Sequence, residues 1–421
     1  MARRYFGTDG VRGVAGELVT ADLVERLGRA AALWSGAKEV LVGRDTRGSG
    51  LELEGAMAVG IASAGANAVL GGILPSGAVA LGALDLGVVI TASHNPPEYN
   101  GVKFFTGGGR KLTDEEEEQI EELLDAPPAG SHGRIEAADT TPGRYLDYVI
   151  DRFGSDLSGL KVVVDCANGA NSLLGPEAFE RLGADVAAIG CDPDGTNINV
   201  GCGATDTALL QREVVHRGAA LGIAFDGDGD RLIAVDEKGE IVDGDGIVAI
   251  LALDLGVDLV AVTQMTNLGF HALMRERGIR VVTTDVGDRY VLEALERESG
   301  VLGGEQSGHV IYLRDHVTGD GLAAGLLLCA ALHRRPLSEA AAVLHRYVQC
   351  KENVRVTSKE LTRPIREAID RANAELGEEG RVLVRPSGTE PIIRVLVEAR
   401  NGALAKEACA TIAALVESEL G

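Results

Sequence analysis

Lys161-Val162-Val163-Val164-Asp165-Cys166-Ala167-Asn168-Gly169 begins as an apolar, β-branched run and ends in a polar turn. A helical pattern follows the turn and ends near Gly183, and Ala184–Ile189 is a second apolar run. Apolar runs of this length that alternate with a helical period are typical of strand–helix–strand units with parallel strands. The stretch therefore predicts an α/β fold.

The same succession of strand, polar turn and helix occurs twice more. Its members are Glu39–Gly43, Arg44–Arg47 and Leu53–Ala64, and then Asp258–Thr263, Gln264–Asn267 and a helix that ends near Gly278, before the strand Ile279–Thr283. Three such units predict three α/β domains of related build, with mainly parallel sheets.

The last part of the chain has a different pattern. Its predicted elements are the strands Lys351–Thr357, Arg381–Val384 and Ile392–Arg400, the helix Leu361–Leu376 and a final helix. This pattern predicts a small α+β domain. The expected bounds are 1–145, 146–245 and 246–347 for the three α/β domains and 348–421 for the α+β domain.

An acidic helix is predicted in the first domain. Thr113-Asp114-Glu115-Glu116 is a capping box that opens a helix as far as Leu124. We expect its acidic run, Glu115–Glu118, to be a solvated helix face and not a metal site.

Composition and charge exclude several classes of protein. The net charge of −23 argues against nucleic-acid binding, which needs a basic face. An anionic substrate would require arginines and backbone donors gathered in one place. The six cysteines show no CxxC spacing, so we expect reduced thiols. No signal peptide is visible, and Leu322–Leu332, the longest apolar stretch, is too short to span a bilayer, so a cytoplasmic protein without membrane contact is expected.

Three carboxylates alternate with glycines in Asp226-Gly227-Asp228-Gly229-Asp230-Arg231, between two apolar runs. The glycines allow the backbone to curl, so that the three carboxylates can meet one hard cation, and few other charged ligands favour Mg²⁺. A calcium EF-hand loop is the rival, but Arg231 stands where that loop needs glycine, and the flanks are strands.

Three further loops contain groups suited to phosphate and sugar. Thr91-Ala92-Ser93-His94-Asn95-Pro96 follows an apolar strand, where Ser93 can be a nucleophile at the carboxyl edge of a sheet. Gly304-Glu305-Gln306-Ser307-Gly308-His309 has donors and acceptors for sugar hydroxyls. Arg385-Pro386-Ser387-Gly388-Thr389-Glu390-Pro391, with Arg394 nearby, is suited to hold a phosphate.

Nicotinamide and ATP chemistry are not supported. Gly244–Ala249 fits GxGxxA, but no ribose-binding acid follows at the required distance, and a Walker A pattern is absent from the sequence.

Taken together and in this order, the four loops resemble the signature loops of the α-D-phosphohexomutase superfamily, over essentially the whole chain. Phe6–Gly13, Glu305–Ser307 and Asp285–Tyr290 are similar to the branch of that family that acts on glucosamine phosphates. One departure is Pro75-Ser76-Gly77, where relatives commonly have Pro-Thr-Pro. It puts the packing of the first domain in question, and not the nucleophile.

The resemblance implies three similar mixed-sheet α/β domains plus a C-terminal α+β domain around a central cleft. It implies interconversion of glucosamine 6-phosphate and glucosamine 1-phosphate through a phosphoserine enzyme and a 1,6-bisphosphate intermediate, as a supply for UDP-N-acetylglucosamine and cell-wall synthesis. Mg²⁺ would be the cofactor and a hexosamine 1,6-bisphosphate the activator. The only expected partner is a small phosphosugar, and the chain would be a monomer or a homodimer.

The resemblance also implies the role of each site residue. Ser93 would carry the phosphoryl group and bind the metal together with Asp226, Asp228 and Asp230. Glu305 and Ser307 would bind the sugar, and the phosphate that is not transferred would meet Arg385, Ser387, Gly388, Thr389 and Arg394. Arg12, Arg231, Lys103 and His309 would surround the reacting group, with Lys103 and His309 as alternative general bases.

Three other functions remain open at this point. A phosphomannomutase/phosphoglucomutase would use the same mechanism on another sugar. A metal-dependent serine phosphatase would use the same serine and metal but admit water. A sensor of phosphosugars would bind without turnover.

Overall fold

The computed structural model describes residues 4–7, 9–138, 141–387 and 391–421, and these residues form two compact units. Unit 1 comprises Met1–Met265 and Ile279–Val343, and unit 2 comprises Thr266–Gly278 and Leu344–Gly421.

Unit 1 contains three mixed sheets. The first has the order β1-β5-β4-β2-β3-β6, with β1 Val11–Val14, β2 Glu39–Arg44, β3 Asn67–Ile73, β4 Leu86–Ile90, β5 Tyr99–Thr106 and β6 Ile135–Ala137. The second has the order β11-β10-β9-β7-β8, with β7 Lys161–Asp165, β8 Asp185–Ile189, β9 Leu221–Phe225, β10 Leu232–Asp236 and β11 Ile241–Val242. The third has the order β13-β12-β14-β15, with β12 Leu259–Thr263, β13 Arg280–Thr284, β14 Leu302–Gly304 and β15 Val310–Tyr312.

One topology is repeated in the three sheets. Each contains three parallel strands and then a strand that returns antiparallel, in the orders β3-β2-β4-β5, β8-β7-β9-β10 and β13-β12-β14-β15. The related build predicted from the three strand–helix–strand units is therefore confirmed. The returning antiparallel strand makes each sheet mixed, as the family resemblance implied, whereas the strand–helix–strand units alone predict only the parallel strands.

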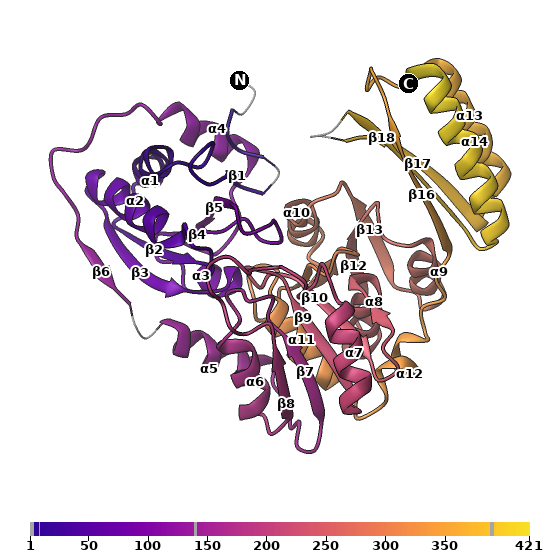
Figure 1. Ribbon diagram of the computed structural model, residues 1–421, viewed down its shortest axis with the longest axis horizontal. Helices are drawn as coiled ribbons and strands as arrows, with labels where there is room; N and C mark the ends of the chain where they lie inside the picture. Colours follow the sequence, from indigo (N-terminus) through magenta and orange to yellow (C-terminus); the bar gives the residue numbers. More distant parts are fainter. Residues whose placement is uncertain (1–3, 8, 139–140, 388–390) are drawn as a thin grey trace. The chain divides into compact units, whose positions relative to one another are not determined.

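Helices cover these sheets. Those of unit 1 are α1 Ala21–Ser35, α2 Gly50–Ser63, α3 Ser76–Leu81, α4 Asp114–Glu122, α5 Thr141–Phe153, α6 Leu174–Arg181, α7 Ala208–Arg217, α8 Gly244–Leu255, α10 Asp288–Glu298, α11 Gly321–Ala331 and α12 Leu337–Ala341. Figure 1 shows α1 and α2 side by side on the first sheet. They approach closely because Gly60 has no side chain: a Cβ there would lie 2.0 Å from the Glu25 carbonyl oxygen. Leu27, Met57 and Ile61 are fully buried in the core between these helices and the sheet.

The acidic helix α4 differs from its prediction in one residue. The capping box of Thr113 and Glu116 is present, as predicted. Glu117, however, is buried, and it accepts a hydrogen bond of 2.7 Å from Nη2 of Arg289 on α10. The expectation of a wholly solvated acidic face was wrong at this residue, because its partner lies 172 residues further along the chain.

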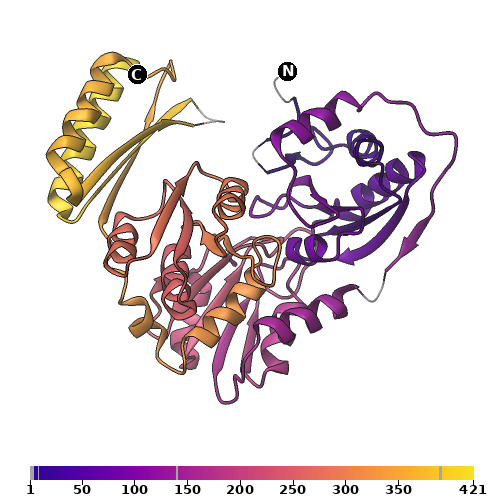
Figure 2. The same cartoon turned by 180° about the vertical axis from the view of Figure 1, so that it is seen from behind.

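Unit 2 is a three-stranded antiparallel sheet with helices on one face (Figure 2). The strand order is β16-β18-β17, and the elements are β16 Val348–Arg355, β17 Gly380–Pro386, β18 Ile392–Ala399, α9 Leu268–Glu276, α13 Arg363–Leu376, the 3₁₀ helix η1 Gly377–Glu379 and α14 Gly402–Leu420. Its core contains Val395 and Val397 from the sheet and Ile365, Ile412 and Val416 from the helices. The predicted α+β domain is confirmed.

All six cysteines are free thiols, as predicted. Within the parts of the chain that the structure describes, no helix combines the length and the apolar character that crossing a bilayer requires.

The buried carboxylate of Glu398 connects three segments of unit 2. It accepts hydrogen bonds from Nε of Arg381 on β17 at 2.6 Å, from Nε2 of Gln349 on β16 at 2.5 Å and from Nδ2 of Asn267, ahead of α9, at 3.0 Å. We predict that Glu398→Ala lowers the free energy of unfolding of unit 2 by about 3–5 kcal/mol, because Arg381 loses its buried counter-charge.

Hydrogen exchange of peptides from β17 and β18, measured in the full chain, would detect this loss. Glu367→Ala is the matched control, since Glu367 lies on α13 in an exposed pair with Arg363. Equal protection of β18 in both variants would contradict the prediction.

Candidate active site

Three of the four predicted loops occupy the same position in the repeated topology. In each sheet the loop joins the third parallel strand to the antiparallel strand that returns. Ser93 lies between β4 and β5, the three aspartates lie between β9 and β10, and Glu305 and His309 lie between β14 and β15. Since these connections leave the carboxyl ends of parallel strands, where α/β folds bind ligands, the repeats bring the three loops to one site in unit 1.

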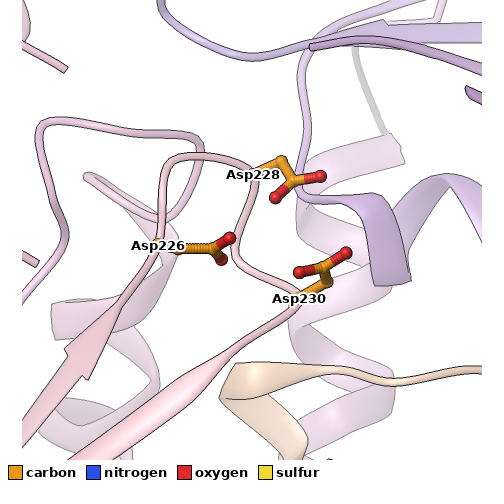
Figure 3. Close-up of side chains that lie close together, drawn as sticks. All are labelled: Asp226, Asp228 and Asp230. Atoms are coloured by element: carbon orange, nitrogen blue, oxygen red, sulfur yellow. The ribbon is translucent and has the colours of Figure 1, made fainter. Parts of the chain in front are cut away.

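The aspartates form a compact cluster of acceptors. One oxygen from each of Asp226, Asp228 and Asp230 lies within 4.8 Å of the others, and all three residues are buried. Figure 3 shows their carboxylates directed toward one another from a single turn of chain. Oδ1 of Asp228 and Oδ1 of Asp230 are buried and accept no hydrogen bond from any residue that the structure describes. Buried carboxylate oxygens of this kind fit a divalent cation with oxygen ligands.

Lys103, on β5, faces this cluster. Its Nζ lies 2.7 Å from Oδ2 of Asp228 and 3.0 Å from Oδ2 of Asp230. Burial alone would lower the pKa of Lys103, but the aspartates around it hold that pKa well above its usual value. Lys103 is therefore a fixed cation beside the triad.

The cluster continues into a closed ring of six alternating charges. Its members in order are Asp230, Lys103, Asp9, Lys111, Asp288 and His309, and His309 returns to Asp230. The separations are 3.2 Å for Lys103–Asp9, 2.8 Å for Lys111–Asp9, 3.1 Å for His309–Asp288 and 3.6 Å for His309–Asp230, and Lys111 and Asp288 are also in contact. The ring joins the first, second and third sheets through ionised side chains.

The ring sets the protonation of the site. Burial would lower the pKa of His309, but Asp288 and Asp230 raise it to about 10. Burial, together with the charges of Asp228 and Asp230, raises the pKa of Asp226 to about 7. At neutral pH His309 is thus a cation.

Ser93 has the geometry of a held nucleophile. It is buried, with φ of 51°, a left-handed conformation that is uncommon for a residue with a side chain. Its Oγ donates to Oδ2 of Asp226 at 2.6 Å and lies 3.2 Å from Nδ1 of His94. Burial and the charges of Arg231 and Arg12 lower the pKa of His94 to about 4, so this imidazole is neutral.

The other predicted residues of unit 1 lie around the same point. Nε of Arg231 is 3.9 Å from Oδ2 of Asp226. Arg12 pairs with Asp9 of the charge ring. Glu305 accepts a hydrogen bond of 3.1 Å from the backbone N–H of Gly287, and Ser307 is exposed.

Unit 2 contains the predicted phosphate loop. Arg385 on β17 and Arg394 on β18 are directly opposite each other in the antiparallel register. Two like charges in such positions destabilise a sheet, and a bound anion would offset that cost. Ser387 is buried, and its carbonyl oxygen accepts a hydrogen bond of 2.7 Å from Nζ of Lys359. Gly388 and Thr389, also predicted for this loop, lie outside the described residues.

Several residues of the site were not predicted as site residues. Asp9 and Asp288 stood within motifs that carried the family resemblance, and this was the available signal. Lys111 carried no such signal. Ser76 stood in the one departure from the family pattern, and its Oγ donates to Oδ2 of Asp228 at 2.7 Å while its N–H donates to the Asp228 carbonyl at 2.9 Å. Although Pro75-Ser76-Gly77 departs from the family's Pro-Thr-Pro, it still places a hydroxyl group, that of Ser76, against the aspartate turn.

Comparison with known proteins agrees with this geometry. The chain matches the family described as phosphoglucomutase/phosphomannomutase in four parts, namely domain I over residues 3–129, domain II over 143–239, domain III over 243–347 and the C-terminal domain over 352–415. It is 51% identical to the phosphoglucosamine mutase of Moorella thermoacetica over 422 residues, which covers 94% of this chain and 95% of that protein.

Solved structures give the same result. A phosphoglucomutase/phosphomannomutase family protein from Burkholderia thailandensis has a TM-score of 0.84 at 25% identity and covers 99% of this chain and 98% of its own. An N-acetylphosphoglucosamine mutase from Aspergillus fumigatus, solved with GlcNAc-6P and magnesium, has the same fold, with a TM-score of 0.69 at 19% identity over 99% of this chain and 96% of its own. The chain belongs to the phosphoglucomutase/phosphomannomutase family and, within it, to the branch of the phosphoglucosamine mutases.

The aspartate cluster generates a prediction about divalent cations. We expect Mg²⁺ to raise the unfolding temperature, because an ion at 100 times its dissociation constant stabilises the folded state by about 2.7 kcal/mol. Asp226→Asn should lose most of this increase. Asp22→Asn, on the exposed face of α1, is the control and should keep it. Thermal unfolding with and without Mg²⁺ measures both, and a full increase in Asp226→Asn would show that the ion binds elsewhere.

Proposed function

We propose that this chain is a phosphoglucosamine mutase that moves a phosphoryl group between the 6- and 1-oxygens of glucosamine phosphate through phosphorylated Ser93. The observation that carries the proposal is the placement of Ser93 Oγ, 2.6 Å from Oδ2 of Asp226 in a buried cluster of three carboxylates and fixed cations. The product would feed the synthesis of UDP-N-acetylglucosamine and the cell wall.

Phosphoryl transfer in this site has two halves. In the first, the free sugar hydroxyl attacks the phosphorus of phosphoserine; the new O–P bond forms as the bond to Ser93 Oγ breaks, and the hydroxyl proton passes to a general base. The resulting 1,6-bisphosphate turns end for end, and its other phosphate returns to Ser93. Arg12 and Arg231 would stabilise the negative charge on the transferred group.

The two proposed general bases, Lys103 and His309, share one property. The aspartates around each raise its pKa above its usual value, so both carry a proton at neutral pH. Either must release that proton before it can accept one from the sugar. His94 is neutral and 3.2 Å from Ser93 Oγ, so it can exchange a proton with the serine when the phosphoryl group leaves.

The cofactor proposed for the triad is Mg²⁺, bound by Asp226, Asp228, Asp230 and Ser93. When bound there, it would neutralise charge on the oxygens of the transferred phosphoryl group. A hexosamine 1,6-bisphosphate would restore phosphoserine after accidental hydrolysis and so act as activator. Ser76, whose hydroxyl meets Asp228, would keep the ligand turn in place.

Two groups of residues are proposed to bind the substrate. Glu305 and Ser307 would bind the sugar hydroxyls. Arg385, Ser387, Gly388, Thr389 and Arg394 would hold the phosphate that is not transferred. We also propose the four domain bounds given above, a monomer or homodimer, a cytoplasmic location and the phosphosugar as sole partner.

The first test is a coupled assay with Mg²⁺ and a trace of hexose 1,6-bisphosphate. We predict that glucosamine 6-phosphate exceeds mannose 6-phosphate and glucose 6-phosphate in kcat/KM by at least about tenfold, or ~1.4 kcal/mol of transition-state preference. Ser93→Ala should be nearly inactive, and Ser131→Ala, in an exposed loop, should be fully active. A preference for mannose or glucose phosphate would change the substrate but keep the mechanism. Mutase activity in Ser93→Ala, or release of inorganic phosphate without isomerisation, would overturn the mechanism.

A second prediction concerns the arginine pair of unit 2. Arg394→Ala should raise KM by roughly 10- to 100-fold with little change in kcat, because a hydrogen bond to a charged group contributes about 1.5–3 kcal/mol. Arg400→Ala is the control, since Arg400 follows the same strand but pairs with Glu379. A fall in kcat without a change in KM would contradict the proposed role of Arg394.

A further inference from the structure

The loop of Ser93 is held by side chains from two different sheets of unit 1. Ser93 has φ of 51°, and a left-handed residue with a side chain costs roughly 1–3 kcal/mol unless its surroundings enforce it. The loop therefore needs partners that keep the nucleophile in this conformation. The candidates are the groups that bind the Ser93 and Asn95 carbonyls.

Arg47, from the turn after β2, is the first partner. Its side chain is fully buried, and its Nε donates to Oδ2 of Asp45 at 2.9 Å. Its Nη2 donates to the carbonyl oxygens of Ser93 at 2.8 Å and Asn95 at 2.9 Å. Its Nη1 donates to the carbonyl oxygens of Pro96 and Tyr99, further along the same loop.

Asn199, from the segment between β8 and α7, is the second partner. Its Nδ2 donates to the same two carbonyls, that of Ser93 at 2.9 Å and that of Asn95 at 3.1 Å. Asn199 is itself left-handed, with φ of 60°, and its N–H donates to the Ala167 carbonyl at 2.9 Å. It is therefore fixed to the second sheet, the sheet that carries the aspartate turn.

Each of the two carbonyls accepts one hydrogen bond from Arg47 and one from Asn199. A carbonyl oxygen has two lone pairs, so both acceptors are fully used. The carbonyl of Ser93 also lies against the aspartate turn: a Cβ at Gly227 would be 2.6 Å from that oxygen and 2.9 Å from Nδ2 of Asn199. The loop of Ser93 and the aspartate turn are thus packed directly against each other at this point.

We infer that Arg47 and Asn199 are positioning residues for phosphoryl transfer, which together hold Ser93 in its left-handed conformation and aim its Oγ at Asp226. The inference rests on the proposed mutase function. Neither side chain touches the reacting atoms. Both act through the Ser93 and Asn95 carbonyls, so their effect should fall on the transfer step and not on substrate affinity.

Asn199→Gly is the most direct test, because glycine keeps the left-handed backbone without strain and removes only the two donors. We expect kcat to fall by about 10- to 100-fold, since a misplacement near 1 Å can cost about a hundredfold, and KM to stay within about twofold. Phosphorylation of Ser93 by hexose 1,6-bisphosphate, followed by intact-protein mass spectrometry, should slow by a similar factor.

Asn197→Ala is the matched control. Asn197 lies in the same segment, and among the described residues its side chain bonds to that segment alone: its Nδ2 donates to the Asp192 carbonyl at 2.9 Å and its Oδ1 accepts from the Asp194 N–H at 3.0 Å. We expect its kcat and loading rate to stay near those of the original chain. Equal losses in Asn197→Ala and Asn199→Gly would overturn the inference, as would a kcat in Asn199→Gly that is unchanged.

Arg47→Lys is a second test of the inference, made in the partner that comes from the first sheet. Lysine keeps the charge beside Asp45 but has a single nitrogen for the loop carbonyls. Because both residues act on the same two carbonyls, the loss of kcat in the double variant should be clearly smaller than the product of the single losses. If the loss of kcat in the double variant equalled the product of the single losses, the two residues would act independently, and the inference that they act together on Ser93 would be overturned. If the unaltered chain lacked mutase activity, or if Ser93→Ala retained it, the proposed function would fail instead.

Discussion

The structure of unit 1 depends on balancing charges that are almost completely removed from water. An ionised carboxylate or ammonium group in a protein interior is stable only with a partner, and removing one partner typically costs about 3–5 kcal/mol. Here the partners come from separate repeats: Lys103 from the first sheet meets Asp228 and Asp230 from the second, and His309 from the third meets Asp230. The three sheets therefore support one another through the groups that also form the site.

This balance explains how a chain with a net charge of −23 can receive an anionic substrate. Long-range charge is repulsive to a phosphate, but the site contains Lys103, Lys111, His309, Arg12 and Arg231 within one cluster. The carboxylates of that cluster are paired with these cations. Among the described residues of this cluster, Oδ1 of Asp228 and Oδ1 of Asp230 are buried and accept no hydrogen bond. A cation bound at these oxygens would reduce the negative charge that repels a phosphate.

Sequence reasoning succeeded where the chemistry is local. The strand–turn–helix–strand units predicted three related domains, and the aspartates of one turn predicted a compact cluster of carboxylates, because neighbouring residues suffice for both. It failed where the partner is distant. Lys111 and Asp9 are 102 residues apart, and no local pattern reveals that they share a ring with Asp288. Glu117 was expected to be solvated for the same reason, since Arg289 reaches it only after the first and third sheets have come together. Likewise, the antiparallel return of β5, β10 and β15 follows from tertiary pairing and not from propensity.

The repeated topology positions three loops of the site by the same strand arrangement. One strand arrangement, used three times, places Ser93, the three aspartates and Glu305 at equivalent hairpins. An equivalent position does not by itself give an equivalent backbone, however. Among these loop residues Ser93 is left-handed, while the aspartate turn uses Gly229, with φ of 72°, for its tight bend. Glycine adopts that conformation freely, but a nucleophile needs a side chain and cannot be glycine. The strain of Ser93 must then be met by bonds from outside its own loop, and the carbonyl contacts of Arg47 and Asn199 have the position and number that this requires.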